Sequence, residues 1–166
     1  MHAGIEEGLN LMEGFQMKNV FDYEVTAELI NRINKLNADS KPQWGKMSVD
    51  QMLAHCCVSY EFVYEDIHPK VSPVKILLLK MLVKKFVVNE KPYSRNSRTA
   101  PEFIMKGDKD FNVEKKRLVE YISRTQKKGE AYFEGKESRS FGKLNKAEWS
   151  NMFYKHLDHH LNQFGV

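Results

Sequence analysis

The sequence predicts an all-α fold, a four-helix bundle with a long helical crossover between the second and third bundle helices. Apolar residues recur at steps of three and four over four long segments, which is the period of a helix with one buried face. No segment shows the strict alternation that is typical of a strand. With 166 residues, 42% of them hydrophobic and 29% charged, the chain can bury the core of one ordinary domain.

The first 17 residues differ from the rest in charge. They carry three acids, no Lys or Arg, and no continuous apolar run of the kind found in a secretory signal. The helical pattern begins only after them. We therefore predict an N-terminal tail, or an alternative upstream start that leaves Met17 as the functional one, over residues 1–17, and one bundle domain over residues 18–166.

The first two bundle helices are predicted at about Asp22–Leu36 and Val49–Glu65. Ser48 and Gln51 form a capping box at the start of the second helix. His55 lies at the edge of the apolar stripe of that helix. It can reach inward across a bundle, or it can be a boundary histidine that a backbone carbonyl satisfies.

The chain's two cysteines, Cys56 and Cys57, are adjacent. This spacing does not form an ordinary structural disulfide, which suits a reducing compartment and predicts a cytoplasmic protein. Cys56 lies near the middle of the apolar face of its helix. We interpret it as an inert core thiol, because nothing in the sequence indicates a lowered pKa.

The crossover begins with a helix predicted over Val74–Val88, started by Ser72-Pro73. This segment is too short and too charged to span a bilayer, and its lysines do not gather on one face as in a membrane-surface helix. We expect it to pack against the bundle or against a second subunit, in a homodimer, through Ile76, Leu79, Val83 and Phe86. Residues 89–109 read as a loop, and a loop of this length is typical of a segment that covers a site.

The third bundle helix is predicted at about Asn112–Lys128, with Gly129 as its end signal. Residues 129–143 form another connection. Asn145 and Glu148 then make the capping box of the final helix.

The final helix carries half of the six histidines of the chain. At 100° per residue, His156 and His160 lie one above the other, on the apolar stripe that begins at Trp149. Two imidazoles placed in this way commonly offer a metal two nitrogens from one rigid element, although a pair that is hydrogen-bonded in a core or at its rim is the alternative. Leu157 follows His156, so the segment is not the His-Glu-x-x-His of a zinc protease. Asp158 points away from the stripe, so a metal site needs a third ligand from elsewhere.

Three segments together resemble the DinB-like superfamily, and within it the branch described as DUF1569. They are Trp44-Gly-Lys-Met-Ser-Val-Asp-Gln-Met-Leu-Ala-His55, Phe141-Gly-Lys-Leu-Asn-Lys-Ala-Glu-Trp149 and His156-Leu-Asp-His-His-Leu-Asn-Gln-Phe-Gly165. The resemblance covers about residues 18–166. It implies a four-helix bundle that holds a divalent metal, usually zinc or nickel, with one histidine from the second helix and two from the last. Carried over to this sequence, those ligands are His55, His156 and His160.

Characterised members of the superfamily are thiol S-transferases that use low-molecular-weight thiols, isomerases and some hydrolases. The resemblance therefore implies a metal-dependent enzyme of the S-transferase or hydrolase type, acting on a small-molecule substrate. No stretch of the crossover identifies a thiol cofactor site, and no catalytic residue is assigned beyond a metal-bound water. Because three histidines fill only part of a coordination shell, we expect a site that opens toward a pocket lined by the crossover, rather than one closed by Cys56, Cys57 or an acid of residues 66–110.

Three further residues are candidates for supporting roles at this site. His159 lies on the rim, where it is a proton shuttle, a group that supports a ligand, or a solvent-facing histidine. Gln163 lies on the ligand stripe and can hold the second nitrogen of a ligand or a bound water. Ser59, one turn past His55, is either a similar support or an ordinary helix serine.

A formal charge of +4, with Lys and Arg scattered along several helices, gives no support to nucleic-acid binding. The alternative function from another class is a non-catalytic bundle. In that interpretation, the chain binds a partner or dimerises through residues 76–88, and its histidines are structural or metal-stabilised.

Overall fold

The computed structural model describes residues 16–166, and it is mostly helical, which confirms the all-α class. The elements are α1 (Tyr23–Asn34), α2 (Val49–Tyr64), α3 (Pro73–Leu82), α4 (Lys84–Val88), the 3₁₀ turn η1 (Pro101–Phe103), α5 (Phe111–Phe133), β1 (Glu137–Ser138), β2 (Gly142–Lys143) and α6 (Lys146–Gln163). The predicted tail, residues 1–17, lies outside the described residues except for Gln16 and Met17. Met17 already packs against the core.

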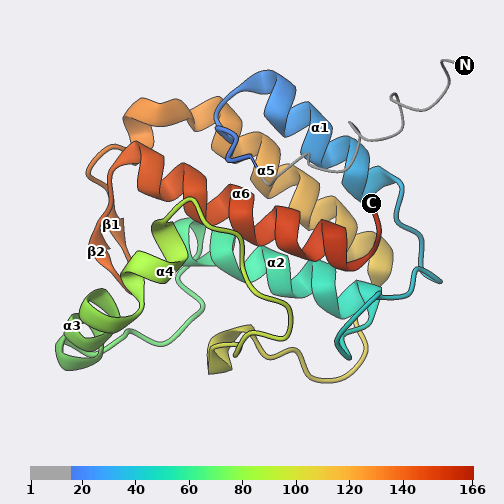
Figure 1. Cartoon of the computed structure of the whole chain (residues 1–166), viewed down its shortest axis with the longest axis horizontal. Helices are drawn as coiled ribbons and strands as arrows, with labels where there is room; N and C mark the ends of the chain where they lie inside the picture. Colours follow the sequence, from blue (N-terminus) through green and yellow to red (C-terminus); the bar gives the residue numbers. More distant parts are fainter. Residues whose placement is uncertain (1–15) are drawn as a thin grey trace, which may run out of the picture.

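Four helices, α1, α2, α5 and α6, lie side by side and contact one another (Figure 1). Helix α2 is the most deeply placed, because its side chains from Met52 to Glu61 are all buried, where the sequence predicted a single stripe. The ring of Tyr60 stacks on Phe153 of α6 at 4.7 Å and on Tyr121 of α5 at 5.8 Å. Both capping boxes form as predicted, at Ser48 for α2 and at Asn145 for α6.

The crossover differs from its prediction. The expected single helix over Val74–Val88 is two helices, broken at Val83, where φ is −111°. Beyond the break, α4 lies on α6, because the buried ammonium of Lys155 binds the main-chain carbonyls of Phe86 and Asn89. Leu79 packs against the core as expected. Val83 and Phe86 are exposed, because the break turns them away from the body of the protein.

Helix α3 stands away from the four packed helices (Figure 1). None of its residues is buried, and five of its apolar side chains are more than half exposed: Val74, Leu77, Leu78, Met81 and Leu82. Within residues 16–166, no helix has the length and apolar character needed to cross a membrane.

The segment after Gly129 also holds structure that the sequence did not indicate. Gly129, with φ 69°, interrupts the helix where its end was predicted, but the chain resumes helical geometry as far as Phe133. The ring of Phe133 is fully buried against Phe21 and Trp149. The β1–β2 hairpin follows. Each strand has only two residues, which is too short for alternation to show.

Candidate metal centre

The structure brings His55 of α2 together with His156 and His160 of α6. One nitrogen from each ring lies within 4.8 Å of the others, and the Nε2 atoms of His55 and His156 are 2.8 Å apart. Within residues 16–166, this cluster includes no Cys, Asp or Glu. His55, which sequence reasoning placed at the edge of a stripe, is almost completely buried. We call these three side chains the histidine cluster.

The second nitrogen of each ring has a protein partner. His55 Nδ1 donates to the main-chain carbonyl of Phe103 at 2.8 Å, and His160 Nδ1 donates to Oε1 of Gln163 at 2.8 Å. His156 Nδ1 lies 3.0 Å from the hydroxyl oxygen of Ser59. Partners of this kind fix the orientation and tautomer of an imidazole, and metal-ligating histidines almost always have one.

Gln163 is itself held by the loop before α2. Its Nε2 donates to the carbonyl of Trp44 at 2.7 Å, which fixes the orientation of the amide, and its main-chain carbonyl accepts from Gln43 at 2.7 Å. Gly45 lies against this amide at φ +82°, and a Cβ there would be 2.7 Å from Gln163 Nε2. Only glycine meets both the conformation and the close approach, so the loop and His160 are positioned together.

These hydrogen bonds determine where the lone pairs point. A carbonyl oxygen can only accept, so His55 and His160 carry their proton on Nδ1 and leave Nε2 as a lone pair. A serine hydroxyl can donate or accept, so His156 can carry its proton on either nitrogen. The cluster therefore has two fixed lone pairs, on Nε2 of His55 and His160. His156 adds a third on its Nε2 when Ser59 accepts the proton of its Nδ1.

The surroundings keep the rings neutral. Burial, together with the imidazole of His159, lowers the pKa of His55. Burial, together with the neighbouring imidazoles, holds the pKa of His156 well below its usual range. The same causes lower the pKa of His160 to about 3. Neutral imidazole is the form that binds a metal cation.

The crossover reaches this cluster at η1. Besides accepting the bond from His55, Phe103 places its ring edge against His55, at 5.3 Å between centroids, and against His156, at 5.6 Å. Sequence reasoning missed Phe103, because it lies in a run with no helical period. The only signal was the unusual length of the loop.

The supporting candidates are placed differently from one another. Ser59 and Gln163 each bond a ring of the histidine cluster. His159 bonds none of the three, and its half-buried ring instead lies between those of Trp44, Tyr93 and His160.

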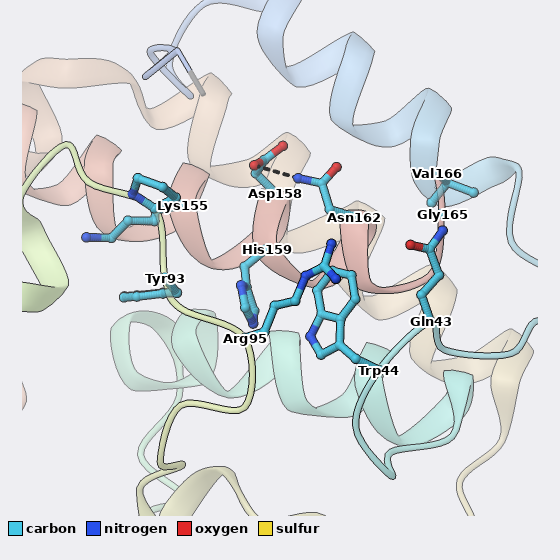
Figure 2. A pocket seen from close by; sticks show the side chains of 11 residues that line it. Gln43, Trp44, Tyr93, Arg95, Lys155, Asp158, His159, Asn162, Gly165 and Val166 are labelled. Atoms are coloured by element: carbon cyan, nitrogen blue, oxygen red, sulfur yellow. Dashed lines mark hydrogen bonds between the residues drawn. The ribbon is translucent and has the colours of Figure 1, made fainter. Parts of the chain in front are cut away.

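A pocket of about 510 Å³ lies beyond His159 (Figure 2). It is lined by the loop before α2, by α6 and by crossover residues: Gln43, Trp44, Pro92, Tyr93, Arg95, Lys155, Asp158, His159, Asn162, Gly165 and Val166. We expected the metal site to open onto a pocket lined by the crossover. The crossover does line this pocket, but the histidine cluster does not, and the nearest link between them is His159, which lines the pocket and has its ring 5.1 Å from that of His160.

The residues present fit a divalent metal ion. Three neutral imidazoles are a nitrogen set suited to zinc or nickel, and two of them already direct lone pairs inward. The indole N–H of Trp44 is the one buried side-chain polar atom among residues 16–166 that has no hydrogen-bond partner. Trp44 lines the pocket beyond His159, so a water or ligand atom bound in that pocket would supply the acceptor that this buried donor needs.

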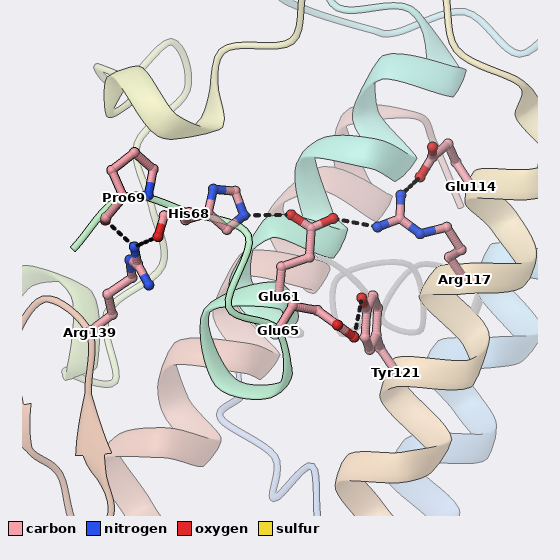
Figure 3. A network of polar contacts seen from close by, with 8 residues as sticks. All are labelled: Glu61, Glu65, His68, Pro69, Glu114, Arg117, Tyr121 and Arg139. Carbon is pink, nitrogen blue, oxygen red and sulfur yellow. Dashed lines mark hydrogen bonds and ion pairs between the residues drawn. The ribbon is translucent and has the colours of Figure 1, made fainter. Parts of the chain in front are cut away.

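A second polar cluster is built on the C-terminal half of α2 (Figure 3). The buried carboxylate of Glu61 accepts from His68 at 2.7 Å and from Arg117, which also pairs with Glu114 at 2.6 Å. Each acid in this cluster has a cationic or hydrogen-bonding partner. We call it the Glu61 cluster.

Comparison with curated proteins found no match, and neither did comparison with solved structures. The sequence does match a family described as "Protein of unknown function (DUF1569)" over residues 16–165. This match covers most of the chain, including both helices that form the histidine cluster. The chain therefore belongs to the DUF1569 family.

Proposed function

We propose that this protein binds a divalent metal ion, zinc or nickel, through His55, His156 and His160, in a DinB-like four-helix bundle. The observation that carries the proposal is that each ring has one nitrogen held by a protein partner, while the other faces its neighbours. A core histidine needs only one satisfied tautomer. Here the Nε2 lone pairs of His55 and His160 both face into the cluster, and the one N–H that can face them, that of His156, can satisfy only one, so the other is left for a cation.

Ser59 supports the proposal through its effect on His156. In the metal-free protein, the 2.8 Å contact is a hydrogen bond that His156 Nε2–H donates to His55, and Ser59 donates to His156 Nδ1. For metal binding, the proton of His156 must lie on Nδ1, and Ser59 must accept it. A hydroxyl serves both states without moving, whereas an amide or a carbonyl would serve only one.

We further propose that the bound metal makes this protein an enzyme of the thiol S-transferase or hydrolase type, with a small-molecule substrate. The chemistry that such an ion supplies when bound is the activation of a water or a thiol, whose pKa it lowers. Phe103 shields the histidine cluster from bulk water, and His156 remains partly exposed, which leaves an approach to the site. The adjacent cysteines suit a reducing compartment, so we propose a cytoplasmic location.

Elemental analysis of untagged protein tests the metal site. We expect close to one equivalent of zinc or nickel in the wild-type protein and none in the His156→Ala variant. His159→Ala is the matched control, because it removes an imidazole from the same helix that bonds none of the cluster, and it should retain the metal. A fully folded wild-type protein that takes up no zinc or nickel on reconstitution would overturn the proposal.

A cobalt-substituted protein tests the thiol step. Glutathione and cysteine should each add a sulfur-to-cobalt charge-transfer band if a thiolate coordinates the ion, and serine should not. Cobalt protein that shows no such band, but cleaves ester or amide probes, would assign the hydrolase type instead.

The exposed face of α3 favours a second candidate, a non-catalytic module that binds a partner or a second copy. At 100° per residue, Val74, Leu77, Leu78, Met81 and Leu82 fall within a stripe about 140° wide, and all five are exposed. An apolar stripe of this size is typical of an interaction surface. Light scattering tests it: the wild-type protein should be a dimer that Leu78→Glu converts to monomer, and a wild-type monomer would exclude the second-copy form.

A further inference from the structure

We propose that the pocket between α6, the loop before α2 and the crossover binds a small molecule through an anionic oxygen group, a carboxylate or a phosphate, with Arg95 as its main contact. Its volume of about 510 Å³ is in the usual range for sites of small molecules. The pocket is separate from the proposed metal site, since none of the three clustered histidines lines it.

Arg95 is the available charged donor in this pocket. Its guanidinium lies over the Trp44 ring, with the central carbon 4.3 Å from the ring centre (Figure 2). Among residues 16–166, it makes no ion pair, and none of its N–H groups has a hydrogen-bond partner. A guanidinium that stacks on an aromatic ring keeps its edge free for two parallel hydrogen bonds to a carboxylate or a phosphate.

The acidic and carbonyl groups of the pocket are already occupied. Asp158 pairs with Arg32 of α1 at 2.7 Å and accepts from Asn162 at 3.0 Å. Arg32 also donates to the main-chain oxygen of Val166 at 2.8 Å. Arg95 therefore has no anion of the protein to bind in this pocket.

Lys155 adds positive charge without offering a donor. Its ammonium already donates to three oxygens, those of the Phe86 and Asn89 main chain and of the Asn89 side chain. None of these oxygens belongs to a carboxylate. The ammonium also lies 4.6 Å from the centre of the Tyr93 ring. A buried cation that no acid neutralises leaves the pocket with a positive potential, which attracts an anion.

The ring of His159 links the pocket to the histidine cluster. His159 lines the pocket, and its ring centroid lies 5.1 Å from that of His160. If the protein is a metal-dependent enzyme, Arg95 anchors the anionic end of its substrate beside the metal. This last step rests on the proposed function, whereas anion binding by the pocket does not.

Fluorine NMR of protein labelled with 5-fluorotryptophan tests the proposal. The chain has two tryptophans, and the Trp44→Phe variant assigns their signals. The probes are benzoate and its neutral isostere benzamide, with inorganic phosphate as the second anion, at constant ionic strength. Benzoate or phosphate should shift the Trp44 signal saturably, benzamide should not, and the signal of the core residue Trp149 should stay in place.

Arg95→Gln should weaken anion binding by roughly 10- to 100-fold, the loss expected when charge-assisted hydrogen bonds are removed. Arg98→Gln is the matched control, because it removes the same charge from another exposed residue of the crossover and should bind as the wild type does. The proposal is overturned if the anions do not move the Trp44 signal, if benzamide binds equally well, or if the two variants lose the same affinity.

The measurement is made on protein stripped of metal by a chelator, so that no anion can report on metal coordination, and the metal content of Arg95→Gln is measured separately. Anion binding in a protein that takes up no metal would contradict the proposed function and leave the pocket assignment standing. A protein with stoichiometric metal whose Trp44 signal ignores all three probes would overturn the pocket assignment alone.

Discussion

Helix α2 contributes to two buried polar clusters. They compensate the free-energy cost of burying polar groups in opposite ways. In the Glu61 cluster, each acid faces a cation or a hydrogen-bond donor of the protein (Figure 3). In the histidine cluster, three uncharged rings meet with no acid among them. The first arrangement is complete as it stands. The second has a surplus of acceptors, which a structural cluster would not need.

The difference shows what separates a structural network from a site. Both clusters contain histidine, and both are buried, so burial and residue type do not distinguish them. The partners do, because Glu61 satisfies His68, whereas His55 and His160 donate their N–H groups to the Phe103 carbonyl and the Gln163 amide and leave their Nε2 lone pairs facing into the cluster. Substitutions in either cluster test this contrast.

The largest expected effect on stability lies in the Glu61 cluster. Arg117→Met should lower the free energy of unfolding by about 3 kcal/mol, because it leaves the buried carboxylate of Glu61 without its guanidinium partner. The partial exposure of Arg117 places this value at the low end for a broken buried pair. Urea denaturation measures it. Metal content should not change, and a loss of metal with this variant would show that the two clusters are coupled.

The pH dependence of stability in the metal-free protein tests the histidine cluster. The pKa of His160 is lowered to about 3, below the value of about 6.5 for an unfolded histidine. Its contribution to stability is therefore fully present above about pH 6.5 and is lost as the pH falls toward 3. At about 1.4 kcal/mol per pH unit, the loss between pH 6.5 and 5 is about 2 kcal/mol.

The measurement is urea denaturation at several pH values in the presence of a chelator. His160→Gln removes the titrating ring, so the slope of stability against pH should flatten by about one proton. An unchanged slope would mean that His160 is not buried as a neutral ring.

The part of the predicted site on the final helix could be derived from the sequence, because that helix has strong signals. The four-residue spacing of His156 and His160 puts them on one helix face regardless of what surrounds it. His55 was harder to place. Its angle on α2 indicated the edge of the apolar stripe, whereas the burial of every α2 side chain from Met52 to Glu61 put it inside.

The rest depended on contacts that periodicity does not encode. The carbonyl of Phe103 and the pocket wall at Arg95 come from a segment without a repeating pattern, and their positions depend on where a loop of some twenty residues runs over the surface. The break at Val83 has no Pro or Gly to announce it. Beyond it, Lys155 donates to the main-chain carbonyls of Phe86 and Asn89, a tertiary interaction that periodicity does not reveal.

Removal of the amide that holds His160 should weaken metal binding without abolishing it. Gln163→Leu frees the ring of His160 and leaves the carbonyl of Trp44 without its donor, so we expect a loss of 10- to 100-fold in metal affinity. Competition with a chromophoric chelator measures the affinity. Asn151→Leu is the control, because its amide lies on the same helix and bonds the Val88 carbonyl, far from any ring of the cluster. Equal losses in both variants would indicate a general loosening of α6.

The smallest effect should come from Ser59→Ala, and it tests the difference between the clusters most directly. The hydroxyl bonds His156 Nδ1 in either tautomer, so its removal leaves this nitrogen without a partner in the metal-free and the metal-bound states alike. The metal-free protein should lose about 1 kcal/mol of stability, as for one buried hydrogen bond. Metal affinity should fall by less than it does with Gln163→Leu, because His156 keeps its ring position through packing against Phe103 and His160. Ser59→Cys restores a weak donor and should recover part of both losses. If Ser59→Ala left stability and affinity unchanged, His156 would not depend on this bond, and the two-tautomer role of Ser59 would be wrong.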